Sequence, residues 1–271
     1  MEAPKNLIIV PFDFTPKAYQ ALEHGAFLAK AIGKQLLILN VATKDKDIPA
    51  AEKKLHFIVE ECNEKYQITP EILVRKGAHP YSVVKSVAEE LNPFLVILKH
   101  SGVRGIKRYT GIRTIKILSG TVISFVVIQD APKTDTLKNI VFPINFLKQH
   151  DAKLKRVVYF SQYYPDATMH IITPSGKDTE KEKLLAANFK VMAKAMADQK
   201  IKVNFITHDK KKNKAEDIIE IAKNVDADMI MIPTEKVSTL SKFLFGLREE
   251  KLIANDGKIP VLCVHSESSV L

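Results

Sequence analysis

Short apolar runs alternate with longer amphipathic stretches along the whole chain. Residues 7–10 are leucine, isoleucine and valine, and apolar residues recur at helical spacing from Pro16 to Ala31. Near-continuous apolar runs are typical of strands in a parallel sheet that is covered on both faces, whereas the helical spacing predicts amphipathic helices. The alternation therefore predicts a doubly wound α/β fold with right-handed crossovers. The first half is expected to hold strands at 7–10, 36–41, 71–75, 94–98 and 122–128, and helices at 16–31, 50–66, 80–91 and 114–118.

The second half of the chain repeats the first. Pro11 aligns with Pro143, and Phe14 aligns with Phe146 at the same shift. A gene duplication explains this repeat, so we expect two tandem domains, 1–132 and 137–271, each a Rossmann-like, five-stranded parallel sheet. The polar, proline-containing stretch between them reads as a linker. The second half is expected to hold strands at 140–142, 168–172, 203–207, 229–232 and 261–264, and helices at 151–163, 180–198, 215–224 and 248–254.

Length and composition place the chain among ordinary globular proteins. Its 271 residues leave room for two domains of usual size, and no apolar run approaches the ~20 residues of a membrane span. The first residues lack the long apolar region of a secretory signal, so we expect a cytoplasmic protein without membrane contact. Cys62 and Cys263 are far apart in the sequence, which argues against a disulfide framework, and Cys263 reads as an inert thiol within a strand.

The net charge of +10 is shared equally between the two halves. A basic surface of this kind attracts anions weakly. Because no basic tail or stripe stands out, we expect a generally solvated basic surface and no specific nucleic-acid partner.

The turns that follow the predicted strands resemble those of the universal stress protein family. Residues 11–13, Pro-Phe-Asp, resemble the V-P-x-D signature after the first strand of that family, and the turn from Gly77 to Pro80 resembles its G-x-P turn. The similarity spans nearly all of both halves. It implies the adenine nucleotide alpha hydrolase-like version of the Rossmann-like fold and a role in the stress response.

Family members that bind ATP surround adenosine with the first-strand aspartate and a valine after the second strand. They wrap the phosphates with G-x2-G-x9-G-[S/T], since glycines let backbone amides approach a phosphate closely. The first half matches this pattern in part, because only five residues separate Gly105 from the next glycine and Ile112 replaces the hydroxyl residue. The candidate ATP-binding residues are Asp13, Val41, Gly102, Arg104, Gly105 and Gly111, with Lys107 and Arg108 as further cationic contacts to phosphate.

The second half departs further from the pattern. Asn145 replaces the aspartate and Thr173 replaces the valine, while Pro233 and Lys236 stand where the first two glycines belong. We therefore expect ATP binding to be weak or absent, and confined to the first domain where it survives.

The chain shows no sequence motif for catalysis. Gly176-Lys177 is followed by Asp178 rather than Ser or Thr, so it is not a Walker loop, and neither G-x-S-x-G nor HExxH occurs. We expect neither an enzyme nor a metal site. His79 reads as a surface residue in a turn, and His100 follows the fourth strand, where it would face either the protein core or the ligand crevice.

Three functions remain open. The first is a non-catalytic stress-response regulator that works through protein partners, and the second is an ATP sensor that uses the first domain alone. The third is a binder of another small anionic or apolar ligand. The fifth strands of the two halves are expected to pair within one chain as an intramolecular pseudo-dimer, and a homodimer of whole chains would add to this.

Overall fold

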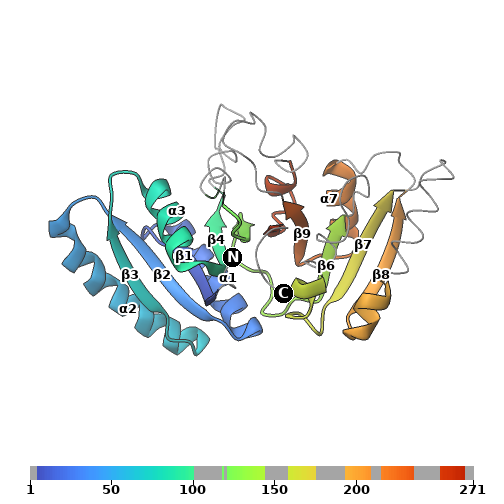
Figure 1. Ribbon diagram of the computed structural model, residues 1–271, viewed down its shortest axis with the longest axis horizontal. Helices are drawn as coiled ribbons and strands as arrows, with labels where there is room; N and C mark the ends of the chain where they lie inside the picture. The colour runs from blue at the N-terminus through green and yellow to red at the C-terminus, as the bar shows by residue number, and fades with distance from the viewer. Residues whose placement is uncertain are drawn as a thin grey trace. The chain divides into compact units, whose positions relative to one another are not determined.

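The computed structural model describes residues 5–100, 118, 121–143, 158–174, 193–208, 215–234 and 251–265. These residues fall into two compact units, the first ending at Asp135 and the second beginning at Thr136. Within each unit the described strands form a parallel sheet with helices packed against it (Figure 1). This is the doubly wound α/β architecture that the sequence predicts. The domain boundaries at 132 and 137 stay a prediction.

The first unit has the strand order β3-β2-β1-β4-β5. The chain starts in the middle of the sheet, adds two strands on one side and then returns to add two on the other. The reversal lies between β1 and β4, which makes the carboxyl ends of these two strands the topological switch point of the unit. The strands are β1 (Lys5–Pro11), β2 (Gln35–Ala42), β3 (Glu71–Lys76), β4 (Pro93–Lys99) and β5 (Phe125–Ile128).

Helices cover both faces of this sheet. Helices α1 and α2 pack together on one face, while α3 packs on β1 and β2 from the other face (Figure 1). At Gly25 in α1 a Cβ atom would lie 2.4 Å from Cγ2 of Val10, so this glycine allows α1 to approach β1 closely. The helices are α1 (Pro16–Ile32), α2 (Ile48–Tyr66) and α3 (Pro80–Leu91), and a short 3-10 turn, η1 (Asp45–Asp47), precedes α2.

The ends of α1 follow from its sequence. Thr15 precedes the helix, and its hydroxyl accepts a hydrogen bond from the backbone N of Ala18 at 3.4 Å, as expected of an N-cap. Pro16 occupies the first turn, where its missing N–H costs nothing. Gly33 ends the helix with φ 64°, a left-handed conformation that glycine adopts without strain.

The second unit has the strand order β10-β9-β6-β7-β8, which matches that of the first unit strand for strand. Parts of the predicted helices 151–163, 180–198 and 248–254 are described, and 158–161, 193–198 and 251–253 are helical. The strands are β6 (Asn139–Pro143), β7 (Thr168–Pro174), β8 (Lys202–His208), β9 (Met229–Thr234) and β10 (Val261–His265), and the helix is α7 (Ala215–Asn224).

The predicted elements agree with the described ones apart from their ends, with one correction. The fifth strand was expected from residue 122 but begins at Phe125. The hydroxyl of Thr121 donates to the carbonyl of Leu118 at 2.8 Å and accepts from the backbone N of Ile123 at 3.3 Å. These local bonds hold the chain in a turn, so it joins the strand later. The predicted helix 114–118 lies outside the described residues except for Leu118.

The core of each unit is built from the buried strands. Cys263 is fully buried in β10, as expected of an inert thiol, and Cys62 is buried on α2. No described helix is both long and apolar enough to cross a membrane.

Candidate functional site

The switch point of the first unit carries a compact polar cluster. Asp13 follows β1, and Lys99 is the last residue of β4, so the two side chains come from the two strands that flank the reversal. In doubly wound sheets ligands bind outside the carboxyl ends of the strands at this position. We call Asp13, Thr15 and Lys99 the Asp13 cluster.

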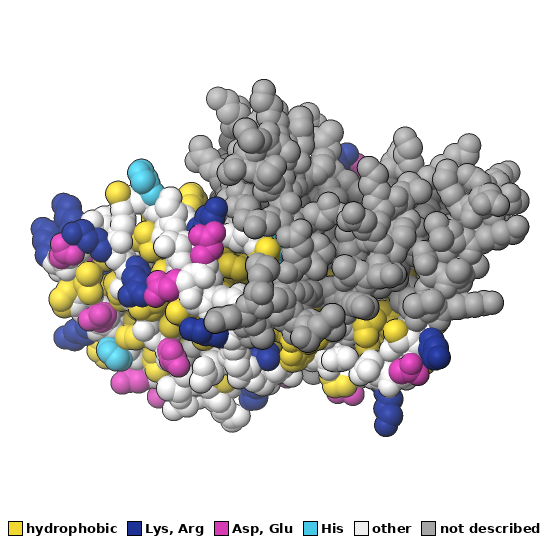
Figure 2. Space-filling model, viewed as in Figure 1, with side chains coloured by type: hydrophobic (Ala, Val, Ile, Leu, Met, Phe, Trp, Pro, Cys, Tyr) yellow, Lys and Arg dark blue, Asp and Glu magenta, His cyan; other side chains and the backbone are white. Residues whose placement is uncertain are grey.

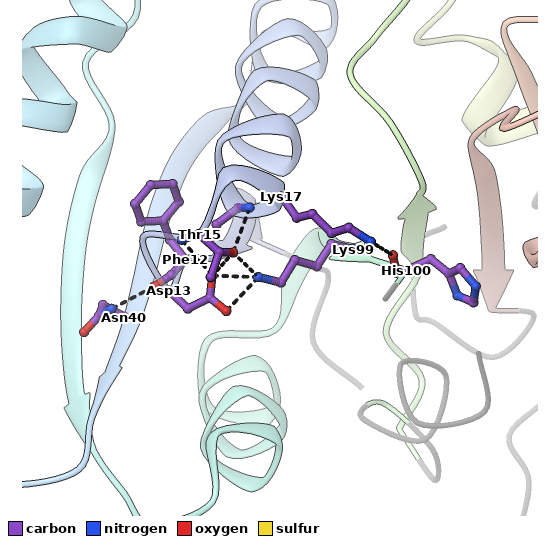
Figure 3. A network of polar contacts seen from close by, with 8 residues as sticks. Phe12, Asp13, Thr15, Lys17, Asn40, Lys99 and His100 are labelled. Atoms are coloured by element: carbon purple, nitrogen blue, oxygen red, sulfur yellow. Dashed lines mark hydrogen bonds and ion pairs between the residues drawn. The ribbon is translucent and has the colours of Figure 1, made fainter. Parts of the chain in front are cut away.

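The Lys99 ammonium binds both oxygens of the Asp13 carboxylate. Its Nζ donates to Oδ1 at 2.6 Å and to Oδ2 at 2.7 Å, and it also donates to the hydroxyl of Thr15 at 2.8 Å. The Thr15 hydroxyl in turn donates to Oδ1 of Asp13 at 2.6 Å. The three side chains therefore form a closed ring of short, charge-assisted hydrogen bonds (Figure 3).

The backbone turn that presents Asp13 is tightly shaped. Phe14 has φ 58°, a left-handed conformation that is uncommon for a side chain of this size. The backbone N of Thr15 donates to Oδ1 of Asp13 at 3.3 Å, which bridges the turn. The Phe12 ring makes edge-to-face contacts with Phe14 and Tyr19, at centroid distances of 5.3 and 5.0 Å. These contacts fix the direction in which the carboxylate points.

Asn40 ties this turn to the neighbouring strand. Its Nδ2 donates to the carbonyl of Phe12 at 2.7 Å, and the backbone N of Phe12 donates to the carbonyl of Leu39 at 2.8 Å. Asn40 is a buried polar residue in an otherwise apolar strand, and this bond gives its amide a partner.

The electrostatics of Asp13 follow from these contacts. Partial burial alone would raise the pKa of the Asp13 carboxyl, but the hydrogen bonds from Lys99 and Thr15 outweigh burial and lower it below its ordinary value. Asp13 is thus a carboxylate at neutral pH and is unsuited to act as a general base, whose pKa would lie near 7.

His100 follows Lys99 but belongs to different surroundings. Its backbone N donates to the carbonyl of Ile128 at 2.7 Å, while its own carbonyl accepts from Nζ of Lys17 at 3.5 Å. The imidazole is buried and points away from Asp13 (Figure 3). Burial, and then the positive charge of Lys17, lower the pKa of His100. Its Nδ1 has no hydrogen-bond partner in the part of the chain that the structure describes.

The structure describes two of the candidate ATP-binding residues. Asp13 lies at the switch point, and Val41 lies half-buried near the end of β2. A Cβ on Gly77 would lie 3.9 Å from Cγ1 of Val41 and 2.2 Å from Cγ2 of Val83, so the glycine lets the turn before α3 pack closely. His79 is exposed beside this turn. Gly102, Arg104, Gly105 and Gly111, with Lys107 and Arg108, lie outside the described residues.

Sequence reasoning missed Lys99 and Asn40. The only signal for each was a polar residue inside or directly after an apolar run. Neither signal names a partner, since the contacts join residues that are distant in the sequence.

The second unit has a row of polar side chains in the amino-terminal halves of its strands. The Asp13 cluster of the first unit lies at the carboxyl ends instead. Nε2 of His170 on β7 lies 2.9 Å from Oδ1 of Asn139 on β6, and Nδ1 lies 3.1 Å from Nδ2 of Asn204 on β8. The amide oxygen accepts and the amide nitrogen donates, so His170 is neutral with its proton on Nε2. Burial lowers the pKa of His170 in agreement with this. We call these three residues the Asn139 row.

The ligand positions of the second half are only partly described. Thr173 lies in β7 and Pro233 lies in β9, while Asn145 and Lys236 lie outside the described residues. In the described parts of both units, no group of three or more His, Cys, Asp or Glu side chains could hold a metal ion.

The visible described surface mixes charges of both signs. Figure 2 shows lysines and arginines interspersed with acidic side chains over the first unit, where the atoms are not grey.

Comparison with known proteins gives one family and one fold. The universal stress protein family model matches twice, over residues 6–128 and 135–265. A universal stress protein from Archaeoglobus fulgidus is 17% identical, with a TM-score of 0.71, covering 97% of this chain and 99% of that one. A putative universal stress protein from Pseudomonas aeruginosa is 16% identical, with a TM-score of 0.64, covering 96% and 93% of the two chains.

The universal stress protein from Archaeoglobus fulgidus in complex with dAMP is 16% identical, and the match covers 47% of this chain and 97% of that one, with a TM-score of 0.36. No curated protein matches the chain significantly.

Proposed function

The chain belongs to the universal stress protein family, and on that premise we propose that it is a non-catalytic stress-response regulator. In this proposal it acts through protein partners in the cytoplasm, and ATP binds weakly or not at all. Its proposed working units are the domains 1–132 and 137–271. A pseudo-dimer of the two halves and a homodimer of whole chains belong to the same proposal, and sedimentation of the purified chain tests the second of these.

The state of Asp13 carries this proposal. Asp13 is the acidic side chain at the switch point of the first unit, and both its oxygens already bind the Lys99 ammonium, at 2.6 and 2.7 Å. A ligand that needs this carboxylate must first compete with an internal cation. The shortened glycine pattern after Gly105 and the replacement of the hydroxyl residue by Ile112 remove further contacts that a nucleotide would use.

The described residues also support a non-catalytic role. Asp13 has a lowered pKa, and the His100 ring points away from it (Figure 3). The Thr15 hydroxyl lies 2.6 Å from the Asp13 carboxylate, but the lowered pKa of this carboxyl makes it a weak base for activating a nucleophile.

Calorimetric titration of ATP into the purified chain tests the proposal. We expect no heat of binding up to millimolar ATP, and the same result with Asp13→Ala. Because the chain has no tryptophan, the ratio of absorbance at 260 and 280 nm is a sensitive check for nucleotide that co-purifies. A micromolar dissociation constant that is lost in Asp13→Ala would refute the proposal.

An ATP sensor that uses the first half alone is the second candidate. The observation in its favour is that the Asp13 side chain is 57% exposed, so a ligand can reach it, and Val41 is present as the expected second contact. The same titration separates the two functions.

A further inference from the structure

We propose that Lys99 is a specificity-determining residue that occupies Asp13 in place of a ligand. In this role its ammonium excludes ligands that would offer neutral hydroxyl or amino donors to the carboxylate, such as a nucleoside. This inference rests on the proposed function and gives a physical reason for its weak or absent ATP binding.

The position of Lys99 makes the contact hard to bypass. Lys99 ends β4 and Asp13 follows β1, so their ion pair bridges the two strands that flank the switch point. The bridge therefore lies where ligands bind in this architecture. Lys99 is also the strand partner of Ile128 on β5, so the sheet holds the backbone from which its side chain reaches Asp13.

The Asp13 cluster leaves little for a neutral ligand to gain. Thr15 donates its hydroxyl proton to Asp13 and accepts from Lys99 at 2.8 Å and from the backbone N of Ala18 at 3.4 Å. Its one donor and two acceptor positions are therefore used. A nucleoside that binds Asp13 would replace two bonds in which both partners are charged by bonds in which only the carboxylate is charged, and these gain less Coulomb energy.

The same geometry shows how to expose the carboxylate. Lys99→Met keeps a long unbranched side chain but removes all three N–H donors. Among the described residues, Thr15 then holds Asp13 alone, and the carboxylate keeps its half-exposed position, so its second oxygen becomes available to a ligand. Lys17→Met is the matched control, because Lys17 lies nearby but contacts the carbonyl of His100 rather than Asp13.

Adenosine is the probe of choice for the experiment. It carries no charge, so the loss of a lysine does not change its affinity through long-range attraction. In calorimetry we expect Lys99→Met to bind adenosine at least about fivefold more tightly than the wild type, which is the effect of about one added hydrogen bond. Where the wild type shows no measurable binding, its affinity is taken as the detection limit of the calorimeter. Lys17→Met should match the wild type, and Lys99→Met with Asp13→Ala should lose the gain.

Two outcomes overturn the inference. Equal affinity of Lys99→Met and the wild type would show that Lys99 does not decide access to Asp13, and weaker binding by Lys99→Met would make Lys99 a ligand contact. The proposed function is judged separately by ATP binding to the wild type, so each can fail alone. A ¹³C NMR titration of the Asp13 carboxyl supplies a readout without ligand: the pKa should rise in Lys99→Met and stay lowered in Lys99→Arg.

Discussion

The two units build the same sheet but place their polar side chains differently. Leu37 on β2 lies in register with Ile9 on β1, and His170 on β7 lies in register with Val141 on β6, at the equivalent positions of the repeat. Leu37 is almost fully buried, as are Ile9 and Leu7 on β1. Its counterpart His170 is also buried but lies between Asn139 and Asn204. One fold therefore accepts either an apolar contact or a polar row at this position.

The comparison separates polar residues that support the fold from those that control a site. In the Asn139 row each ring nitrogen of His170 meets a complementary amide, at the amino-terminal part of the strands and away from the switch point. The Asp13 cluster instead pairs a positive and a negative side chain at the carboxyl ends of the strands, where ligands bind in this architecture. Burial alone therefore does not make His170 a candidate for function, whereas the place of the Asp13 cluster at the carboxyl ends of the strands supports our proposal for it.

The largest expected effect on stability comes from shortening Leu37, the apolar counterpart of His170. Leu37→Ala leaves a cavity in a buried sheet, and such changes cost about 2–5 kcal/mol of unfolding free energy. Urea denaturation followed by hydrogen exchange of strand amides should show this loss in the first unit. Equal losses of protection in both units, or a loss below about 1 kcal/mol, would contradict the assigned packing.

Acid should weaken the first unit through His24 on α1. Burial lowers the pKa of His24 to about 4, although its Nε2 donates to the carbonyl of Asp130 at 2.9 Å. The folded pKa lies below the unfolded value of 6.5, so the stabilisation is complete above pH 6.5 and is lost as the pH falls towards 4. The shift corresponds to about 3 kcal/mol.

Urea midpoints at pH 7 and pH 4.5 measure this pH dependence. His24→Gln keeps a donor for the Asp130 carbonyl but cannot be protonated, so it should flatten the dependence in the first unit. A slope that is unchanged in His24→Gln would show that another group is responsible.

The counterpart change in the second unit should cost less than Leu37→Ala. His170→Ala removes two neutral hydrogen bonds, each worth about 1 kcal/mol. Asn204 is exposed and Asn139 is half-buried, so both amides regain water and leave no stranded donor. We expect a loss of about 1–2 kcal/mol in denaturation, and a loss as large as that of Leu37→Ala would remove the distinction between the two positions.

The smallest expected effect on stability is that of Lys99→Met. The Lys99 and Asp13 side chains are 24% and 57% exposed, and exposed ion pairs contribute about 0–1 kcal/mol. The unfolding free energy should therefore change by less than about 1 kcal/mol. A loss of several kcal/mol in thermal or urea denaturation would make Lys99 a structural residue rather than a specificity determinant.

The sequence was sufficient for the elements but not for the contacts between them. Helix α3 and the carboxyl end of α7 match their predicted bounds, because Pro80 and the apolar spacing mark α3, and Lys223 marks the last turn of α7. Asp13 could be predicted because residues 11–13 resemble the signature that follows the first strand in the universal stress protein family. Lys99 could not be assigned as its partner, since the two residues lie 86 positions apart and meet only when β4 is inserted beside β1. The Asn139 row was missed for the same reason, because its register arises from three separate strands.

The state of the Asp13 carboxylate in the presence of ATP tests the central claim most directly. In a ¹³C spectrum of aspartate-labelled protein, with the resonance assigned by Asp13→Asn, we expect a lowered pKa in the wild type. We also expect no change in the Asp13 signal as ATP rises to millimolar concentration, because Lys99 remains bound to the carboxylate. A saturable shift of this signal with ATP would show that the nucleotide displaces Lys99, and it would contradict the account.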